Sequence, residues 1–199
     1  MNSNGKSYTL QLDGLGPVLF ERSQRAKRIG ITVRPFRGVR VAVPRRVSWE
    51  KAERFALDKI DWIRRQVSRA RERENEARQL VAENPLPGRA EARRILVDRL
   101  AELARQYGFT YERVRVANQQ SRWGSCSGRN TISLNLQLLF LPADLRDYVI
   151  LHELVHTRHK HHGPAFWREL ERYIADSTAL RRRLRSHTIM PPELCRTRT

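Results

Sequence analysis

The segment from His152 to His156 has the residue types and the spacing that favour metal chemistry. It reads His-Glu-Leu-Val-His, so two histidines lie four positions apart. On an α-helix such positions share one face, and both imidazoles can reach a single ion. Glu153 lies beside them and can act on a metal-bound water without being a ligand itself. This is the pattern of zinc hydrolases that use two histidine ligands and a glutamate as general base.

A catalytic zinc ion takes three protein ligands and keeps one position open for water. His162 follows His156 by six residues, which is the spacing of the third ligand in one class of zinc protease. We therefore predict His162 as the third ligand. That class has glycine at the position of His159, and here we expect the chain to turn around 163–164 instead. The alternative third ligands are His159, His161 and Glu171.

Such a site is suited to the hydrolysis of a peptide bond. Zinc lowers the pKa of its bound water, Glu153 takes the proton, and the hydroxide attacks a carbonyl that the metal polarises. Glu153 then returns the proton to the leaving amine. The oxyanion needs a donor besides zinc, and the candidates are Arg122, Ser125 and backbone N–H groups of residues 121–128. A competing mechanism would use Cys126 as nucleophile, but nothing in the sequence places it at a helix N-terminus, where its thiolate would be favoured.

The elements that must position these residues follow from local patterns. Pro142 suits the first turn of a helix that runs through the motif, and a shorter helix follows 163–164. Residues 131–136 alternate between polar and apolar side chains, which predicts a strand, and 113–117 predicts another. A further amphipathic helix is expected over residues 89–107.

The first part of the chain has a different pattern. Short β-rich runs between residues 8 and 44, separated by Gly and Pro, predict a basic antiparallel sheet or hairpin. Ser48 reads as the N-cap of an amphipathic helix to residue 67, with a charged helical extension to residue 83. A breaker at 84–88 ends it. We predict an N-terminal part at 1–84, a catalytic core at 85–186 and a loose tail at 187–199, which can act as one compact unit.

Composition narrows the class of protein. The 199 residues are 40% hydrophobic and include four Trp, enough to build a core and to exclude a disordered chain. The sequence has neither an apolar run that could span a membrane nor a visible signal peptide. Its two cysteines cannot form a disulfide framework. We therefore expect a cytoplasmic protein without membrane contact.

The net charge of +18 favours anionic partners such as nucleic acid or nucleotides. Residues 21–46 contain nine basic side chains and one acid, and 181–185 form a second basic cluster. These clusters are the predicted contacts for such a partner. They lie apart in sequence from the proposed zinc site, so they bias which molecules approach it and do not identify the chemistry.

Several of these segments together resemble a known family. The C-terminal residues that carry the resemblance are Ser121–Cys126, Ile132–Asn135, Pro142, Tyr148–Val149, His152–His156, His162 and Phe166–Trp167. The N-terminal ones are Ser23, Arg25, Ala26, Arg28, Val39–Pro44 and Asp61–Ile63. Over most of the chain from about residue 20 to 185, with the segment around 70–90 and both termini outside it, the sequence resembles the YgjP-type metal-dependent hydrolases, which are relatives of the SprT-like zinc metalloproteases.

The resemblance implies a zincin-like α+β fold, in which the HExxH helix packs under a small antiparallel sheet. It implies that His152, His156 and His162 bind one catalytic zinc ion and that Glu153 is the catalytic acid. In that fold the strand 131–136 would be the edge with which a peptide pairs by β-addition. The pairing residues would be Ile132, Ser133, Leu134 and Asn135.

The function predicted from the sequence is a zinc metallopeptidase that acts on a peptide or protein substrate. One alternative is a metal-dependent hydrolase of nucleoside triphosphates or other phosphate-containing substrates, because the arginine-rich N-terminal sheet could bind phosphates. Against it, the sequence has no Walker-type loop and no acidic cluster for magnesium. A second alternative is a non-enzymatic nucleic-acid-binding protein with structural zinc, in which Glu153 would have no purpose.

Overall fold

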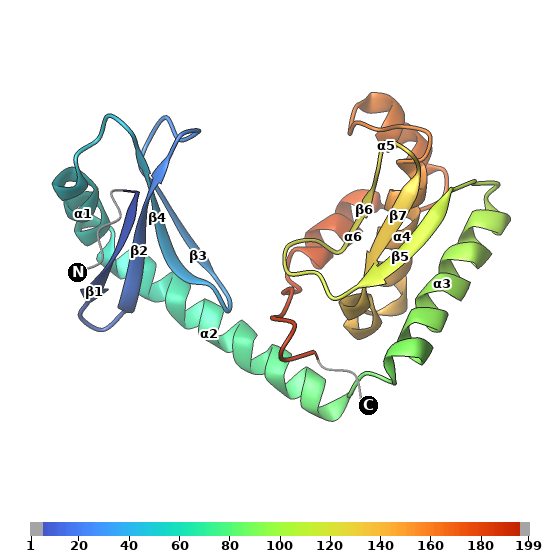
Figure 1. Cartoon of the computed structure of the whole chain (residues 1–199), viewed down its shortest axis with the longest axis horizontal. Helices are drawn as coiled ribbons and strands as arrows, with labels where there is room; N and C mark the ends of the chain where they lie inside the picture. The colour runs from blue at the N-terminus through green and yellow to red at the C-terminus, as the bar shows by residue number, and fades with distance from the viewer. Residues whose placement is uncertain (1–5, 196–199) are drawn as a thin grey trace. The chain divides into compact units, whose positions relative to one another are not determined.

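The computed structural model describes residues 6–195, which form a mixed α+β structure (Figure 1). Its contacts divide the chain into two compact units, with the division between Glu76 and Ala77. Unit 1 holds the first sheet, and unit 2 holds the second sheet and the histidine motif. Over the described range, the helices are too short or too polar to cross a membrane.

The strands are β1 (Ser7–Leu12), β2 (Gly16–Ser23), β3 (Gly30–Arg34), β4 (Gly38–Pro44), β5 (Arg113–Ala117), β6 (Gly124–Cys126) and β7 (Thr131–Asn135). The α-helices are α1 (Trp49–Asp58), α2 (Ile60–Glu83), α3 (Arg89–Gln106), α4 (Ala143–Val155), α5 (Pro164–Glu171) and α6 (Ser177–Leu184). A 3₁₀ helix, η1, covers Leu136–Phe140.

The sheet of unit 1 has the strand order β1-β2-β4-β3. Successive side chains of each strand point to opposite faces of this sheet. On one face, Phe20 and Val41 are fully buried and belong to the same core as Ala52 and Ala56 of α1. The prediction of a wholly antiparallel sheet is wrong, because β2 and β4 pair in parallel. β3 lies between β2 and β4 in the sequence but pairs antiparallel with β4 at the far edge of the sheet. β4 therefore runs in the same direction as β2.

The predicted helix from residue 48 to 67 is two helices. Ser48 caps α1 as expected, since its hydroxyl accepts a hydrogen bond of 3.2 Å from the backbone N–H of Lys51. The chain leaves helical geometry at Lys59, and α2 then continues to Glu83. The division between the two compact units, after Glu76, lies inside α2. The predicted boundary after residue 84 coincides instead with the end of this helix, and it stays a prediction.

Unit 2 is built on the sheet β5-β7-β6, with helices packed on one of its faces (Figure 1). Ile132 and Leu134 of β7 are fully buried against Leu145 and Leu154 of α4. Leu96 of α3 belongs to the same core. Because α4 is buried over most of its surface, the histidine motif is held at a fixed place on the sheet.

The prediction that residues 131–136 form an edge strand is wrong. β7 is the central strand of its sheet, with β5 parallel on one side and β6 antiparallel on the other. The residues expected to pair with a peptide therefore already pair with β5 or β6: Ile132, Ser133, Leu134 and Asn135. An alternating pattern predicts which face of a strand is buried but not how many neighbours it has. The sheet is also mixed rather than antiparallel.

The predicted loose tail is packed on unit 2 as far as residue 195. Met190 and Cys195 are buried, and the side chain of Gln137 makes two hydrogen bonds with the backbone of Met190, at 2.8 and 2.9 Å. These contacts supply hydrogen-bond partners for the buried amide of Gln137. The prediction is therefore wrong for residues 187–195, while 196–199 lie outside the described residues.

Candidate active site

Helix α4 places His152 and His156 one turn apart at its C-terminal end. The imidazole of His162, in the loop that follows, comes back to meet both of them. Its Nε2 atom lies 2.9 Å from Nε2 of His152 and 3.1 Å from Nε2 of His156. The structure thus brings together the three histidines that the motif spacing selects, and His159, His161 and Glu171 are not part of the group.

The three nitrogens fit a single metal ion. Their ligand atoms all lie within 4.8 Å of one another, and zinc–nitrogen bonds of about 2.0–2.1 Å in a tetrahedron would put ligand nitrogens about 3.3 Å apart. A cation at the common point of the three nitrogens could accept a lone pair from each of them, whereas an Nε2 proton can serve one neighbour at most. Zinc accepts imidazole nitrogen readily, so the donor chemistry fits as well.

The protonation of the histidines suits this role. Nδ1 of His156 lies 2.9 Å from the carbonyl oxygen of His159. A carbonyl only accepts, so Nδ1 donates and the neutral ring presents a lone pair at Nε2. Burial, with a smaller effect of the neighbouring imidazoles, lowers the pKa of His152 to about 3, and burial also lowers the pKa of His156 and of His162. All three rings are therefore neutral at pH 7.

Two aromatic residues of α5 support the imidazoles. The ring of Phe166 is fully buried and lies 4.5–4.8 Å from the three imidazole centroids. Trp167 stacks on His162 at 5.7 Å and donates from Nε1 to the carbonyl of His162. Pro164 begins this helix, where its missing N–H costs nothing, so the turn at 163–164 sets the position of both rings.

The loop between His156 and His162 is fixed at two points. The guanidinium of Arg158 donates to Glu169 of α5 at 2.7 Å and to the carbonyl of Gly108 at 2.6 Å. Lys160 donates to the carbonyl of Ser127 at 3.0 Å and to the side chain of Asn130, both in the turn between β6 and β7. These contacts reduce the freedom of His162, which lies in the loop beyond His156, the C-cap residue of α4.

Glu153 follows His152 in α4 and points into the protein. Its side chain is almost fully buried, with 5% of the residue exposed, and no group in residues 6–195 forms a hydrogen bond with its Oε2 atom. Burial raises the pKa of this carboxyl group to about 8, and the positive charge of Arg122 acts in the opposite direction. A buried carboxyl group with an unused oxygen is costly to keep, and such groups are concentrated at reaction sites.

Gly124 of β6 forms the wall against which Glu153 packs. A Cβ atom at this position would lie 2.7 Å from Cγ and 2.8 Å from Oε1 of Glu153. The backbone conformation does not require glycine here, since φ is not in the left-handed region. Close approach is therefore the reason for the glycine, and it brings β6 against this carboxyl group.

The two side chains predicted to stabilise an oxyanion, Arg122 and Ser125, differ in their position relative to Glu153. Arg122 is close enough to lower the pKa of Glu153. Ser125 pairs with Ser133 across the sheet, and because side chains alternate along a strand it lies on the opposite face from the Gly124–Glu153 contact. This placement disfavours a role for the Ser125 side chain in stabilising an oxyanion.

Asn135 has a use that differs from the predicted pairing with a peptide. It is fully buried, and its amide nitrogen donates to the carbonyls of Gln119 and Arg122 at 2.8 and 2.9 Å. Its oxygen accepts from the backbone of Gln119 and of Gln137. The buried amide of Asn135, at the end of β7, thus anchors the loop that contains Arg122.

The comparison with protein families agrees with this geometry. A family model described as "YgjP-like, metallopeptidase domain" matches residues 27–88 and 87–187, which is well over half of the chain. The chain belongs to the YgjP-like family. This membership identifies it as a metallopeptidase-type hydrolase, a class that depends on a divalent metal, and the His152, His156 and His162 cluster could bind one.

Solved structures similar to this YgjP-like chain include two crystal structures of metallopeptidase zymogens. Abylysin from Pyrococcus abyssi is 22% identical, with 48% of this chain and 99% of that chain covered and a TM-score of 0.42. Jannalysin from Methanocaldococcus jannaschii is 23% identical, with 45% and 92% covered and a TM-score of 0.41. No curated protein matches the chain.

The alternative nucleophile of this YgjP-like chain, Cys126, is poorly suited to that role. It packs against the core of unit 2, and burial raises the pKa of its thiol, an effect that the charge of Lys160 only partly offsets. A catalytic cysteine needs a stabilised thiolate, and hence a lowered pKa. The cysteine mechanism is therefore disfavoured.

Sequence reasoning missed the role of Gly124 and the support that Asn135 gives to Arg122. Gly124 lies within a segment that reads as an ordinary glycine-rich connection, and only the three-dimensional approach of Glu153 gives it a purpose. The signal for Asn135 was a polar residue at a buried position of an alternating strand. Such a residue needs hydrogen-bond partners inside the protein, but the pattern does not name them.

Proposed function

We propose that this chain is a zinc-dependent metallopeptidase with a zincin-like catalytic unit. His152, His156 and His162 hold one zinc ion, and Glu153 transfers protons in the hydrolysis of a peptide bond. The observation that carries this proposal is a buried carboxyl oxygen of Glu153 with no hydrogen-bond partner among residues 6–195, in the residue that directly follows His152 of the cluster of three imidazoles. A structural zinc site would have no use for such a group.

Each residue of the site has a separate role in the proposed reaction. Zinc, when bound, supplies a Lewis acid that polarises the substrate carbonyl and makes water acidic near neutral pH. In its ionised form, which the positive charge of Arg122 favours, Glu153 accepts a proton from the attacking water and gives it to the leaving amine nitrogen. Gly124 keeps this carboxyl group in place by direct contact, and Arg122 adds positive charge on the side of β6. Phe166 and Trp167 keep the imidazoles in their orientation.

The substrate pairs with β6 in this proposal. β6 ends the strand order β5-β7-β6, so its outer edge has no partner strand among the described residues. An extended peptide can bind such an edge through its backbone. Because Gly124 of β6 touches Glu153, a peptide bound there would pass beside the carboxyl group. The edge strand of the proposal is therefore 124–126 rather than 131–136.

The test is the substitution Glu153→Gln in the full chain. The zinc content should stay at that of the unchanged protein, because Glu153 is not among the three clustered ligands, whereas hydrolysis of a degenerate peptide library should fall by about 10²–10⁴-fold. Glu171→Gln is the matched control, since Glu171 is an exposed glutamate of α5 outside the cluster. This control should retain full activity.

Nucleoside triphosphates are assayed in parallel with the peptides. Release of phosphate by the unchanged chain but not by Glu153→Gln would show that the site hydrolyses phosphate-containing substrates, as in the first alternative. Peptide cleavage that survives Glu153→Gln would show that the assigned proton-transfer group is wrong. Absence of hydrolysis of either substrate class by the zinc-loaded chain, together with tight binding of nucleic acid, would favour the non-enzymatic alternative.

A further inference from the structure

A polar cleft of about 620 Å³ lies on the face of the β5-β7-β6 sheet that is turned away from the core. Its lining consists of charged and hydroxyl-bearing side chains together with Cys126: Glu112, Arg113, Arg115, Arg122, Ser125, Cys126, Ser127, Arg129, Thr131 and Ser133. Four of these residues are arginines and one is an acid. The cleft belongs entirely to unit 2, so its composition does not depend on the other unit.

The strand register explains how these side chains meet. Arg115 of β5, Ser133 of β7 and Ser125 of β6 form one row across the three strands, because Ser133 pairs with both of the others. Arg113 and Thr131 form the next row. Alternate residues of β5 and β7 point into the core, so the residues of these rows face outward. The surface offers hydroxyl groups in the middle and guanidinium groups around them.

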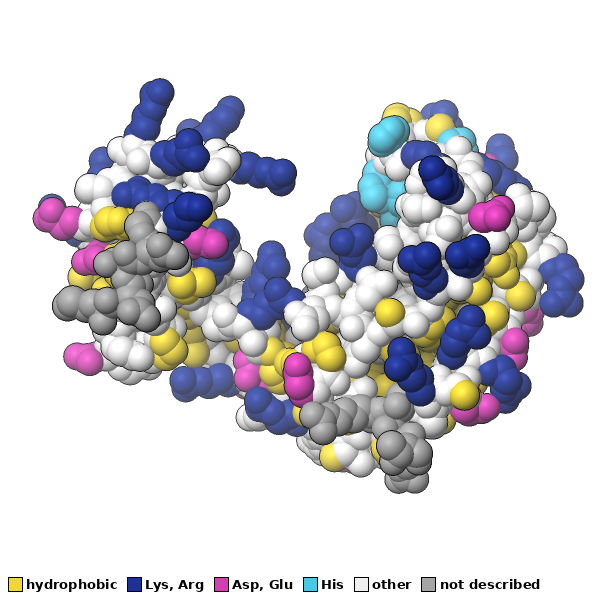
Figure 2. Space-filling model, in the orientation of Figure 1, with side chains coloured by type: hydrophobic (Ala, Val, Ile, Leu, Met, Phe, Trp, Pro, Cys, Tyr) yellow, Lys and Arg dark blue, Asp and Glu magenta, His cyan; other side chains and the backbone are white. Residues whose placement is uncertain are grey.

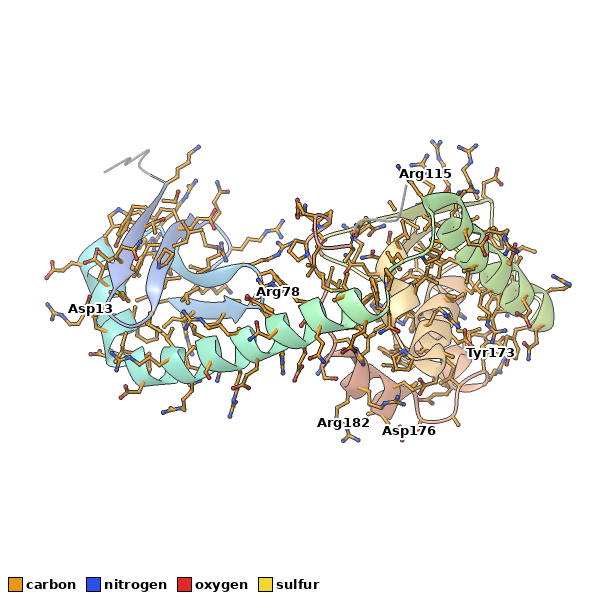
Figure 3. All side chains as sticks on the ribbon, turned by 90° about the horizontal axis from the view of Figure 1, so that it is seen from below. Asp13, Arg78, Arg115, Tyr173, Asp176 and Arg182 are labelled. Carbon is orange, nitrogen blue, oxygen red and sulfur yellow. The ribbon has the colours of Figure 1, made fainter. Side chains whose placement is uncertain are left out.

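The positive charge of this surface is not compensated. Over residues 6–195, none of the four cleft arginines forms an ion pair, and Glu112 is the only acid in the lining. Arginines elsewhere in unit 2 do have carboxylate partners, such as Arg99 with Asp147 and Arg183 with Asp144. Figure 2 shows Lys and Arg side chains gathered over this part of unit 2, below the histidines. In Figure 3 Arg115 projects on the opposite side of the unit from Asp176 and Arg182.

The cleft and the candidate active site lie on opposite faces of the sheet and share the strand β6. Gly124 touches Glu153 on the inner side of the sheet, and the next residue, Ser125, lines the cleft on the outer side. A peptide added to the edge of β6 would send alternate side chains to the two faces of the sheet. Every second side chain would then point toward the outer face, where the arginines lie.

The lining favours a peptide over a nucleic acid. Proteins that follow single strands of nucleic acid combine a basic groove with aromatic rings on which the bases stack. The cleft has the basic groups but no aromatic ring. Guanidinium and hydroxyl groups without a stacking surface are suited to carboxylates, which accept two parallel hydrogen bonds from one arginine.

We propose that the cleft lined by Arg113, Arg115 and Arg129 is a substrate subsite that binds acidic side chains of a peptide paired with β6. This inference rests on the proposed peptidase function and adds the substrate class to it: peptides with Asp or Glu at alternate positions next to the cleaved bond. The subsite acts on substrate binding and does not take part in proton transfer.

The test uses the zinc-loaded full chain carrying Glu153→Gln, so that peptides bind without being cleaved. Two fluorescein-labelled decapeptides serve as probes, one of alternating Glu and Ala and one of alternating Gln and Ala. Fluorescence anisotropy should give a dissociation constant about tenfold lower for the Glu peptide, and the difference should shrink as salt is raised. Adding Arg113→Gln and Arg115→Gln should remove most of this preference.

The matched control adds Arg65→Gln and Arg69→Gln instead, which remove the same charge from exposed positions of α2. It should keep the preference for the Glu peptide. In the otherwise unchanged chain, Arg113→Gln with Arg115→Gln should raise KM for acidic peptides about tenfold and leave kcat unchanged. Arg122 is left intact in both experiments because its charge acts on Glu153.

The subsite is overturned if neither decapeptide binds, if both bind equally, or if the control variant loses the preference to the same extent. It is also overturned if a single-stranded oligonucleotide binds tightly to the unchanged cleft and binds weakly after Arg113→Gln and Arg115→Gln. The cleft would then be a nucleic-acid site. These outcomes leave the peptidase proposal standing as long as the unchanged chain cleaves a degenerate peptide library and Glu153→Gln does not.

Discussion

Glu153 and Gly124 show how closely one backbone position can control a reacting group. The carboxyl group of Glu153 is almost fully buried, and its Oε2 atom has no hydrogen-bond partner among residues 6–195. The orientation of this side chain therefore depends on packing, and the backbone at Gly124 supplies that packing from the side of β6. A change at Gly124 should alter the reaction without touching any metal ligand.

Gly124→Ala is predicted to lower peptide hydrolysis by at least about tenfold, because the added methyl group would lie 2.7 Å from Cγ of Glu153 and must displace it. The zinc content should not change. Gly128→Ala is the control, since a Cβ atom there meets nothing within 4 Å. Assays of hydrolysis and of metal content on both variants check this, and equal activity of the two variants would contradict the contact.

The histidine cluster leads to a second prediction at this scale. His162→Ala should reduce the zinc content of the purified chain at least tenfold, because it removes one of three nitrogens that approach a common point. His159→Ala should leave it nearly unchanged. Only the backbone carbonyl of His159 contacts the cluster, and that carbonyl remains after the substitution. Metal analysis under identical dialysis conditions makes the comparison, and loss of zinc in His159→Ala alone would reverse the assignment.

At the scale of elements, the loop between β5 and β6 is held by Asn135 at the end of β7. Asn135→Ala is predicted to lower the free energy of unfolding by about 2–3 kcal/mol, because it removes the hydrogen bonds of a buried amide to the backbone of Gln119, Arg122 and the buried Gln137. Urea denaturation measures this change. Asn84→Ala, at the exposed end of α2, is the control and should cost less than about 0.5 kcal/mol.

The sequence predicts these elements unevenly, and the reasons are physical. The spacing of His152, His156 and His162 is set by one helical turn and a short loop, so local geometry brings them together and pattern reasoning reaches them. Pairing between strands is not local. The alternation of residues 131–136 identifies the buried face of β7 correctly, through Ile132 and Leu134, but the neighbours β5 and β6 come from chain segments whose pairing the pattern does not encode.

The same distinction applies to the tail and to the long helix. Residues 187–195 are polar and contain proline, which predicts a loose end, yet buried Met190 and the side chain of Gln137 fix it to unit 2. The break at Lys59 was missed because apolar residues continue at helical spacing on both sides of it. A single residue outside helical geometry does not interrupt such a pattern.

At the scale of the whole molecule, the net charge of +18 is distributed among several uses. Arg22 of the basic segment 21–46 donates to the carbonyls of Pro44 and Val47 and lies over the ring of Trp49. Arg183 of the cluster 181–185 pairs with Asp144. Part of both predicted anion-binding segments is therefore used within the fold. The cleft on the β5-β7-β6 sheet, whose arginines form no ion pair within residues 6–195, is the better candidate for binding an acidic ligand.

Zinc binding should stabilise the folded chain, because the three imidazoles converge only when α4 and the loop after it are in place. A ligand that binds only the folded state, at a free concentration a hundredfold above its dissociation constant, adds about 2.7 kcal/mol. The melting temperature of the unfolding transition of unit 2 should thus rise by several degrees when zinc is added to chelator-treated protein. The His162→Ala variant should show little or no rise in the same scan. An equal rise in this variant would mean that the stabilising zinc binds elsewhere, and the histidine cluster would lose its assignment as the metal site.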